Sequence, residues 1–328
     1  GLHKLLSDTM IPGELGEENR AYLQDAFTGS DRGRPSLVYA LVIAPSTEEG
    51  VNTASLTQGL GLLEAVSLDY LAAMPDAVEE ELALVDAWVR KQREEYRTVK
   101  LVRPAGEEGS NSMGVIDFDE PGLKVGNKPV PPARFCARIA GVLAGTPMGM
   151  SATYAPLPEV TAVTNRDKDA QAAAVDNGRL ILLHDGQKAK IARGVNSLTE
   201  IPAEGKADWR KIKVVETMYL ITYYLRTTVD DEYRGRYPNT YDNKQVLVSE
   251  ISAWFQELEA QGVLNQGESY CEIDYQRQFD YLRGKGVDVS GMTEQQILEY
   301  QTDSWVFLRC GGRVVDAMED FEVLFNNH

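Results

Sequence analysis

The chain has 328 residues, of which 43% are hydrophobic and 25% charged, a composition typical of a globular protein with more than one domain. Its 50 acidic and 33 basic residues give a formal net charge of −17, which argues against a nucleic-acid surface. No apolar run approaches the ~18 residues that cross a bilayer, so no membrane insertion is expected. The three cysteines are odd in number and widely spaced, which argues against a disulfide framework or a zinc site.

The first 50 residues predict a helix over 16–27 and a buried strand over 36–44. Connectors that contain glycine and proline join these elements. They do not form a closed unit, so residues 1–50 are interpreted as a partial N-terminal segment.

From residue 53 onward, helical and strand patterns alternate. Leucines three and four residues apart predict a helix over 53–66, and a short apolar run follows at 68–74. Residues 77–97 form the clearest amphipathic pattern, with Leu82, Val85, Val89 and Tyr96 on one face. Strands predicted at 98–104 and 113–118 complete an order that indicates a mainly parallel sheet covered by helices.

A helix is predicted over 133–144, opened by Pro131-Pro132 and ended at Gly145. Its small residues, Ala137, Gly141 and Ala144, keep it thin, so that a neighbouring segment can approach closely. A short helix over 167–176 follows. Residues 179–192 then predict a hairpin with Asp185-Gly186 at its turn, a position that requires positive φ.

The alternation of helical and strand patterns stops near residues 200–208. Long helices are predicted over 209–233 and 243–262, shorter ones over 275–283 and 293–300, and two strands over 305–327 around Gly311-Gly312. The second long helix is expected to bury Val246, Ile251, Trp254, Phe255 and Leu258. The predicted fold is an α/β domain at 51–203, with a mainly parallel, helix-covered sheet. An α+β domain at 204–328, with long helices and C-terminal strands, follows it.

No residue set predicts a catalytic, cofactor-binding or metal site. The sequence has three histidines, His3, His184 and His328, but no GxSxG motif that would supply a serine nucleophile. Cys136 and Cys310 lie in apolar patterns, so we interpret them as small buried hydrophobic residues. Acidic residues cluster in the sequence at 117–120, 230–232 and 319–320. We interpret each cluster as part of a solvent-exposed surface and not as a catalytic or metal site. Residues 59–61 lack the third glycine of a dinucleotide loop and fall inside a helical pattern. Tyrosines and arginines over 219–241 fit a protein contact or core packing equally well.

The end of the chain alternates in the manner of a half-buried strand. Phe321, Val323 and Phe325 share one side, and Glu322, Leu324 and Asn326 share the other. Such a strand can pair within its own domain or add to the open sheet edge of a neighbour, and periodicity leaves both readings open.

Several segments stand out for their amino-acid sequences and for their order along the chain. They are ARIAGVLAGTPMGMSATY at 137–154, AVDNGRLILLHDG at 174–186, RGVNSL at 193–198, YDNKQVLVSEISAWF at 241–255 and VVDAMEDFEVLF at 314–325. As a set they resemble the tail sheath proteins of contractile bacteriophages, of the type found in Gram-positive phages, defective prophages and phage-tail-like bacteriocins. The resemblance covers roughly residue 53 to the C-terminus.

The resemblance implies a structural subunit, not an enzyme, that needs no cofactor. It would assemble with copies of itself into six-fold rings stacked helically around a tail tube. It would then contract to drive the tube through a target envelope. Implied partners are the tail tube protein and the baseplate and tail terminator proteins. The implied location is the virion tail, and the host bacterial cytoplasm during assembly.

The resemblance also suggests residues for these roles. Phe321, Val323 and Phe325 become candidates for a strand that links subunits. Asp316, Glu319 and Asp320, which precede or adjoin it, become candidates for contacts that change on contraction. Sheath proteins usually begin with an extended arm and an additional portion, which residues 1–50 do not provide.

Two other classes of protein stay open. One is an α/β enzyme with its site at the carboxyl ends of the parallel strands, which would require a deep pocket and perturbed titratable groups. The other is a tail-tube, baseplate or adhesin component. Tube proteins are smaller and largely β, so the long helices argue against that reading.

Overall fold

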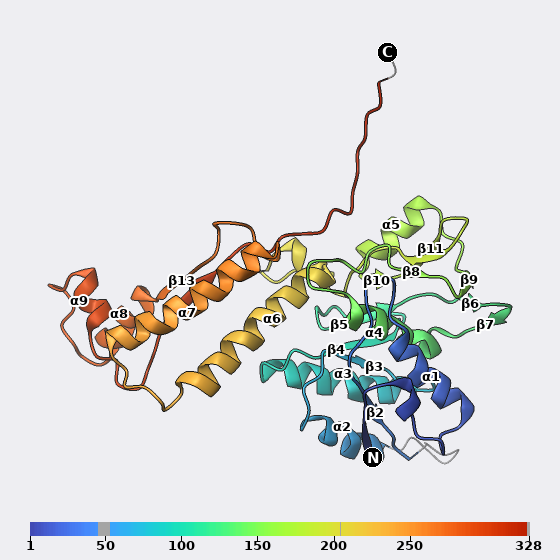
Figure 1. The fold of residues 1–328 in the computed structure, drawn as a ribbon, viewed down its shortest axis with the longest axis horizontal. Helices are drawn as coiled ribbons and strands as arrows, with labels where there is room; N and C mark the ends of the chain where they lie inside the picture. Colours follow the sequence, from blue (N-terminus) through green and yellow to red (C-terminus); the bar gives the residue numbers. More distant parts are fainter. Residues whose placement is uncertain (45–52, 204, 327–328) are drawn as a thin grey trace. The chain divides into compact units, whose positions relative to one another are not determined.

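The computed structural model describes residues 1–44, 53–203 and 205–326. They form two compact units, Gly1–Glu216 together with Ala317–His328, and Thr217–Asp316 (Figure 1). The sequence places a domain boundary at 203–204, whereas the first unit extends to Glu216, because Ile212 is buried in that unit's core. Residues 50 and 204, where predicted segments begin or end, and His328 lie outside the described residues.

The first unit is built on several short strands and a small number of helices. Its strands are β1 (Leu2–Leu5), β2 (Val38–Leu41), β3 (Tyr70–Ala72), β4 (Lys100–Pro104), β5 (Val115–Phe118), β6 (Lys124–Val125), β7 (Lys128–Pro129), β8 (Pro156–Leu157), β9 (Val160–Ala162), β10 (Arg179–Leu180), β11 (Leu182–His184) and β12 (Ala189–Ile191). Its helices are α1 (Glu17–Thr28), α2 (Thr53–Leu63), α3 (Glu79–Glu94), α4 (Cys136–Gly145) and α5 (Lys168–Asp176), and α6 (Ile212–Thr228) begins in it. Short 3₁₀ helices lie at Asp8–Met10, Pro132–Phe135 and Ala207–Arg210.

The predicted parallel sheet is confirmed. Its strand order is β10-β5-β4-β3, and every neighbouring pair is parallel. Alternate residues point to opposite faces: Leu101 and Val115 pack with α2 and α3, whereas Val102 and Ile116 pack with α4. Both faces of the sheet are therefore buried, as is typical of parallel sheets.

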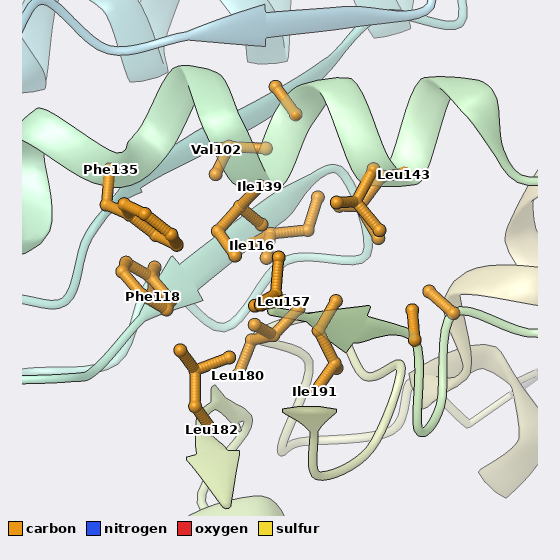
Figure 2. Close-up of a cluster of buried hydrophobic side chains, with 14 of the residues drawn as sticks. Val102, Ile116, Phe118, Phe135, Ile139, Leu143, Leu157, Leu180, Leu182 and Ile191 are labelled. Carbon is orange, nitrogen blue, oxygen red and sulfur yellow. The ribbon is translucent and has the colours of Figure 1, made fainter. Parts of the chain in front are cut away.

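The core on the α4 face joins three layers of structure. Ile139 and Leu143 of α4 meet Ile116 of the sheet and Leu157 and Ile191 of the smaller β11-β12-β8 sheet (Figure 2). The predicted hairpin is only partly right. β11 and β12 pair antiparallel, with Gly186 at φ +93° in the loop, but β10 joins the parallel sheet through β5 instead.

The clearest amphipathic helix forms as predicted, with one residue misplaced. Leu82, Val85 and Val89 are buried on one face of α3. Tyr96, which was assigned to the same face, is 72% exposed with φ +61°. The helix ends at Glu94, so the periodicity no longer places Tyr96, and the left-handed backbone turns it into solvent.

The prediction of a thin helix at 133–144 is confirmed, although its first turn, Pro132–Phe135, is 3₁₀. Helix α1 packs directly on α4. A Cβ at Gly141 would come within 2.9 Å of the carbonyl carbon of Ala26 and closer still to its oxygen. Glycine is thus required at 141 because the backbones of the two helices touch there.

Asp25 lies beside this contact, and burial raises the pKa of its carboxyl to about 6, with Arg138 opposing the shift and Glu159 adding to it. The folded-state pKa exceeds the unfolded value of 3.8, so native stability falls as the pH rises from about 4 to about 6. We expect Asp25→Asn to raise the urea midpoint at pH 8 and to leave it unchanged near pH 4. The exposed Asp31→Asn is the control, and equal effects of the two variants at pH 8 would contradict the burial argument.

The second unit holds most of α6, α7 (Tyr241–Ala260), α8 (Tyr275–Gly284) and α9 (Glu294–Glu299), with the antiparallel pair β13 (Tyr270–Ile273) and β14 (Leu308–Gly311). The long helix expected over 209–233 is α6, followed by a π-helical turn at Val229–Tyr233. Ile251, Phe255 and Leu258 are buried in α7 as expected. Trp254 is only partly buried, and Val246 is 58% exposed, so the prediction is wrong for Val246.

A buried lysine holds three parts of the second unit together. Lys244 of α7 donates to Gln278 Oε1 of α8 at 3.2 Å and to Thr302 Oγ1 after α9 at 3.0 Å. Burial lowers the pKa of Lys244. These hydrogen bonds compensate for part of the cost of removing the ammonium group from water.

Candidate functional site

The C-terminal segment returns to the first unit and is held there by Glu319. Ser151 Oγ donates to Glu319 Oε1 at 2.6 Å, and Arg193 Nη1 donates to Oε2 at 3.0 Å. The Glu319 side chain is only 10% exposed. Both carboxylate oxygens therefore have a strong donor, which is the condition under which a shielded carboxylate is stabilising.

The two donors stand on loops that are fixed by their own hydrogen bonds. Ser151 and Thr153 lie in the loop after α4, and Arg193 follows β12. The amide of Thr153 donates to Ser151 Oγ at 3.1 Å, and the amide of Gly194 donates to Thr153 Oγ1 at 2.8 Å. Arg32 donates to the Thr153 carbonyl at 2.8 Å and also to that of Ser151. The site for Glu319 is thus held together by the first unit itself.

Arg193 also pairs with Asp320, so one guanidinium bridges two successive carboxylates. Partial burial disfavours its charged form, but the contacts with Asp320 and Glu319 outweigh that effect and raise the pKa of Arg193. Asp320 is 81% exposed, so water and salt weaken its share of the pairing. Asp316 is exposed and is the last residue of the second unit. We name the set Ser151, Arg193, Glu319 and Asp320 the anchor.

Beyond the anchor the chain is apolar and uncovered. Phe321, Val323 and Phe325 are 74%, 83% and 85% exposed, and Leu324 is 84% exposed. Residues 317–326 form neither helix nor strand within the described chain. An exposed run of large hydrophobic side chains is typical of a segment that binds another protein. We name residues 321–326 the arm.

Removing the Glu319 carboxylate should release the base of the arm. We expect Glu319→Ala to increase amide hydrogen exchange at residues 317–320, because Arg193 and Ser151 lose their shared acceptor. The neighbouring Asp320→Asn is the matched control and should change exchange little, since Asp320 is mostly solvated. Equal exchange in the two variants would show that Glu319 does not hold the segment.

The carboxyl ends of the parallel strands, where an enzyme of this class would have its site, carry carboxylates in structural roles. The prediction of a solvated face is wrong for Asp117 and Glu120, which are buried. Asp117 accepts from Ser110 N and Ser110 Oγ, each at 2.8 Å, and Glu120 accepts from Leu182 N and Arg166 Nη1, each at 3.1 Å. A cavity of about 100 Å³ opens near Tyr70, which begins β3, so it does not lie at these strand ends. It is also smaller than the ~300–1,000 Å³ of typical ligand sites.

Within residues 1–44, 53–203 and 205–326, no group of three or more histidine, cysteine, aspartate or glutamate side chains could hold a metal ion. Over the same residues, no helix is long and apolar enough to cross a membrane.

Comparison with known proteins identifies the family. Residues 204–326, which contain the arm and its acidic base, match the model of the phage tail sheath C-terminal domain. The chain is 35% identical to the tail sheath protein of Clostridium phage phiCD119 over 324 residues, which covers 98% of this chain and 88% of that protein. The chain belongs to the phage tail sheath protein family.

Solved sheath structures share the fold of this sheath chain. The helical sheath of the anti-feeding prophage in its contracted state superposes with a TM-score of 0.70 at 16% identity, over 99% of this chain and 87% of that one. The sheath tail protein of Desulfitobacterium hafniense gives a TM-score of 0.61 at 20% identity, over 73% of this chain but only 60% of its own length.

The sequence indicates Glu319 and Asp320 as candidates for contacts that change on contraction, without indicating a partner, and that role stays a prediction. Ser151 and Arg193 supply that partner, and they lie in two segments, 137–154 and 193–198, on which the family resemblance depends. The sequence feature that could have indicated Ser151 and Arg193 is their position in segments that resemble sheath proteins.

Proposed function

We propose that this sheath protein assembles with copies of itself into six-fold rings stacked helically around a tail tube, and that contraction of this lattice drives the tube through a target envelope. The observation that carries the proposal is the arm. It is an exposed apolar segment that leaves an ordered, charged anchor and has no partner strand in the described chain.

The chemistry of the arm favours a second copy of the chain as its partner. Its residues alternate as a strand does, and an extended segment can add to the open edge of another sheet through main-chain hydrogen bonds. In a strand, Phe321, Val323 and Phe325 would share one face and become buried together. The anchor contacts, Glu319 and Asp320 on Arg193, are proposed to change on contraction, and Asp316 precedes them at the end of the second unit.

The proposed partners follow from the relatives. Solved structures of the anti-feeding prophage that share this fold include its contracted helical sheath and its baseplate, which supports self-assembly and association with a baseplate. The tail tube and tail terminator proteins are further proposed partners. We assign the chain to the virion tail and, during assembly, to the host bacterial cytoplasm.

A structural role is favoured over an enzymatic one because the relatives are sheath proteins and the buried carboxylates of the sheet have structural partners. The alternative is an enzyme that acts at the carboxyl ends of the strands, whereas the cavity near Tyr70 lies elsewhere.

Electron microscopy tests the proposal directly. The full chain is concentrated in elevated salt, which screens the repulsion expected from a net charge of −17, and imaged in negative stain. Hollow striated tubes or stacked six-fold rings are expected. Monomers that persist at all concentrations and salt levels would contradict self-assembly of this chain.

A further inference from the structure

Two of the three cysteines face each other in the second unit. Strands β13 and β14 pair antiparallel, with Cys271 directly opposite Cys310. Their Sγ atoms lie 3.1 Å apart, and both thiols are free. Cys136 is buried in α4 of the first unit. The fold therefore brings together two thiols that are 39 residues apart in sequence.

The strand register places this pair where a covalent bond fits. The amide of Asp274 donates to the carbonyl of Phe307 at 2.9 Å, so these two residues form a hydrogen-bonded pair of the ladder. Hydrogen-bonded and non-hydrogen-bonded pairs alternate, which makes Cys271 and Cys310 a non-hydrogen-bonded pair. Cα atoms in such pairs lie about 4.5 Å apart. That distance falls within the ~4.4–6.8 Å at which a disulfide forms without backbone movement.

We propose that Cys271 and Cys310 are a reversible oxidation site, which forms an intramolecular disulfide when a small-molecule disulfide such as oxidised glutathione is the oxidant. The Cys310 thiolate attacks one sulfur of the oxidant, whose S–S bond breaks and releases one glutathione thiolate. The Cys271 thiolate then attacks the Cys310 sulfur and displaces the second glutathione. The two thiol protons pass to the two released thiolates, and the protein's two electrons reduce the oxidant.

The surroundings of the two thiols assign their order of reaction. Cys310 is partly exposed, whereas Cys271 is 9% exposed. The hydrogen bond between them raises the pKa of Cys271, to which burial and the Glu272 charge add. The same hydrogen bond lowers the pKa of Cys310. The accessible thiol with the lower pKa attacks first, so Cys310 captures the oxidant and Cys271 resolves the mixed disulfide.

The bond would close a loop that contains α8 and α9. Leu282, Val289 and Ile297 form the small core of this loop. A cross-link between residues 271 and 310 restricts the unfolded chain, so the oxidised second unit should unfold at a higher denaturant concentration than the reduced one.

The test uses the intact full chain with oxidised glutathione as the probe. Free thiols are alkylated after exposure, and the digested protein is analysed by mass spectrometry without reduction. We expect one peptide pair joined through Cys271 and Cys310, with Cys136 alkylated. Added thiol reductant should restore two free thiols. No reaction at either residue, a stable glutathione adduct on the wild type, or a bond between two chains would each overturn the proposal.

Two variants separate the assigned roles. Cys271→Ser should retain one glutathione on Cys310, because the resolving thiol is gone. Cys310→Ser should react at least ~10-fold more slowly, because the remaining thiol is buried and the oxidant reaches it less easily. Cys136→Ala is the control and should form the internal disulfide as the wild type does. Faster capture by Cys271 than by Cys310 would reverse the assigned order and overturn this part of the proposal.

Discussion

Deletion of residues 321–328 is expected to abolish polymerisation while both compact units stay folded. The described part of the deleted segment buries none of its large side chains against the rest of the chain, so its loss removes no core contact. It does remove the only segment we propose to link one subunit to the next. Sedimentation and negative-stain microscopy would measure assembly, and circular dichroism on heating would measure the stability of the units.

A finer variant separates apolar burial from backbone pairing. Simultaneous replacement of Phe321, Val323 and Phe325 by serine leaves the main chain able to pair but removes one apolar face. We expect assembly to weaken at least ~10-fold, since each buried side chain of this size contributes about 1.5–3 kcal/mol. The control is Glu322→Ser with Asn326→Ser on the opposite side, which should assemble nearly normally. Tubes of ordinary appearance from the truncated chain would refute the linking role.

Substitution of Gly141 by alanine is expected to lower the free energy of unfolding of the first unit by about 3 kcal/mol. The added methyl group would overlap the backbone of Ala26, and backbone atoms cannot rotate away as a flexible side chain can. Helices α1 and α4 would have to separate. Urea unfolding followed by fluorescence measures the change.

The chain offers a matched control in Gly61, a helical glycine of α2. A Cβ there meets nothing within 4 Å, so Gly61→Ala should stabilise the protein by up to ~1 kcal/mol through helix propensity alone. Both variants replace a helical glycine by alanine. Gly141→Ala should nevertheless lower the free energy of unfolding, whereas Gly61→Ala should raise it. Stabilisation by Gly141→Ala would mean that the two helices are not in backbone contact.

Features that depend on local pattern could be predicted from the sequence. The parallel sheet follows from apolar runs that alternate with helical stretches, and the thin helix follows from Gly141 and its small neighbours. Errors fall where an element ends or where one helix face is left uncovered. Tyr96 lies beyond the last turn of α3, and Val246 lies on a face of α7 that the chain leaves exposed. Periodicity carries no information on either point.

Features that depend on distant residues could not be predicted. Arg193 and Glu319 are 126 residues apart, and nothing in their separate patterns indicates an ion pair. The pairing of β13 with β14, and with it the approach of Cys271 to Cys310, likewise requires the fold of α8 and α9 between them. The linking role proposed for the arm comes from the family resemblance, because an exposed segment has few contacts within its own chain that could indicate a role.

The position of the anchor determines how far the arm can reach from the first unit. An extended residue advances about 3.3 Å, so the six residues from Phe321 to Asn326 reach roughly 20 Å beyond Asp320. If the arm joins a neighbouring copy, the edge that receives it must lie inside that radius. A rearrangement that moves the edge farther away would put the arm under tension, and Glu319 would bear that tension through Ser151 and Arg193. The arm then acts as a tether of fixed length, which limits how far two linked subunits can separate without detaching.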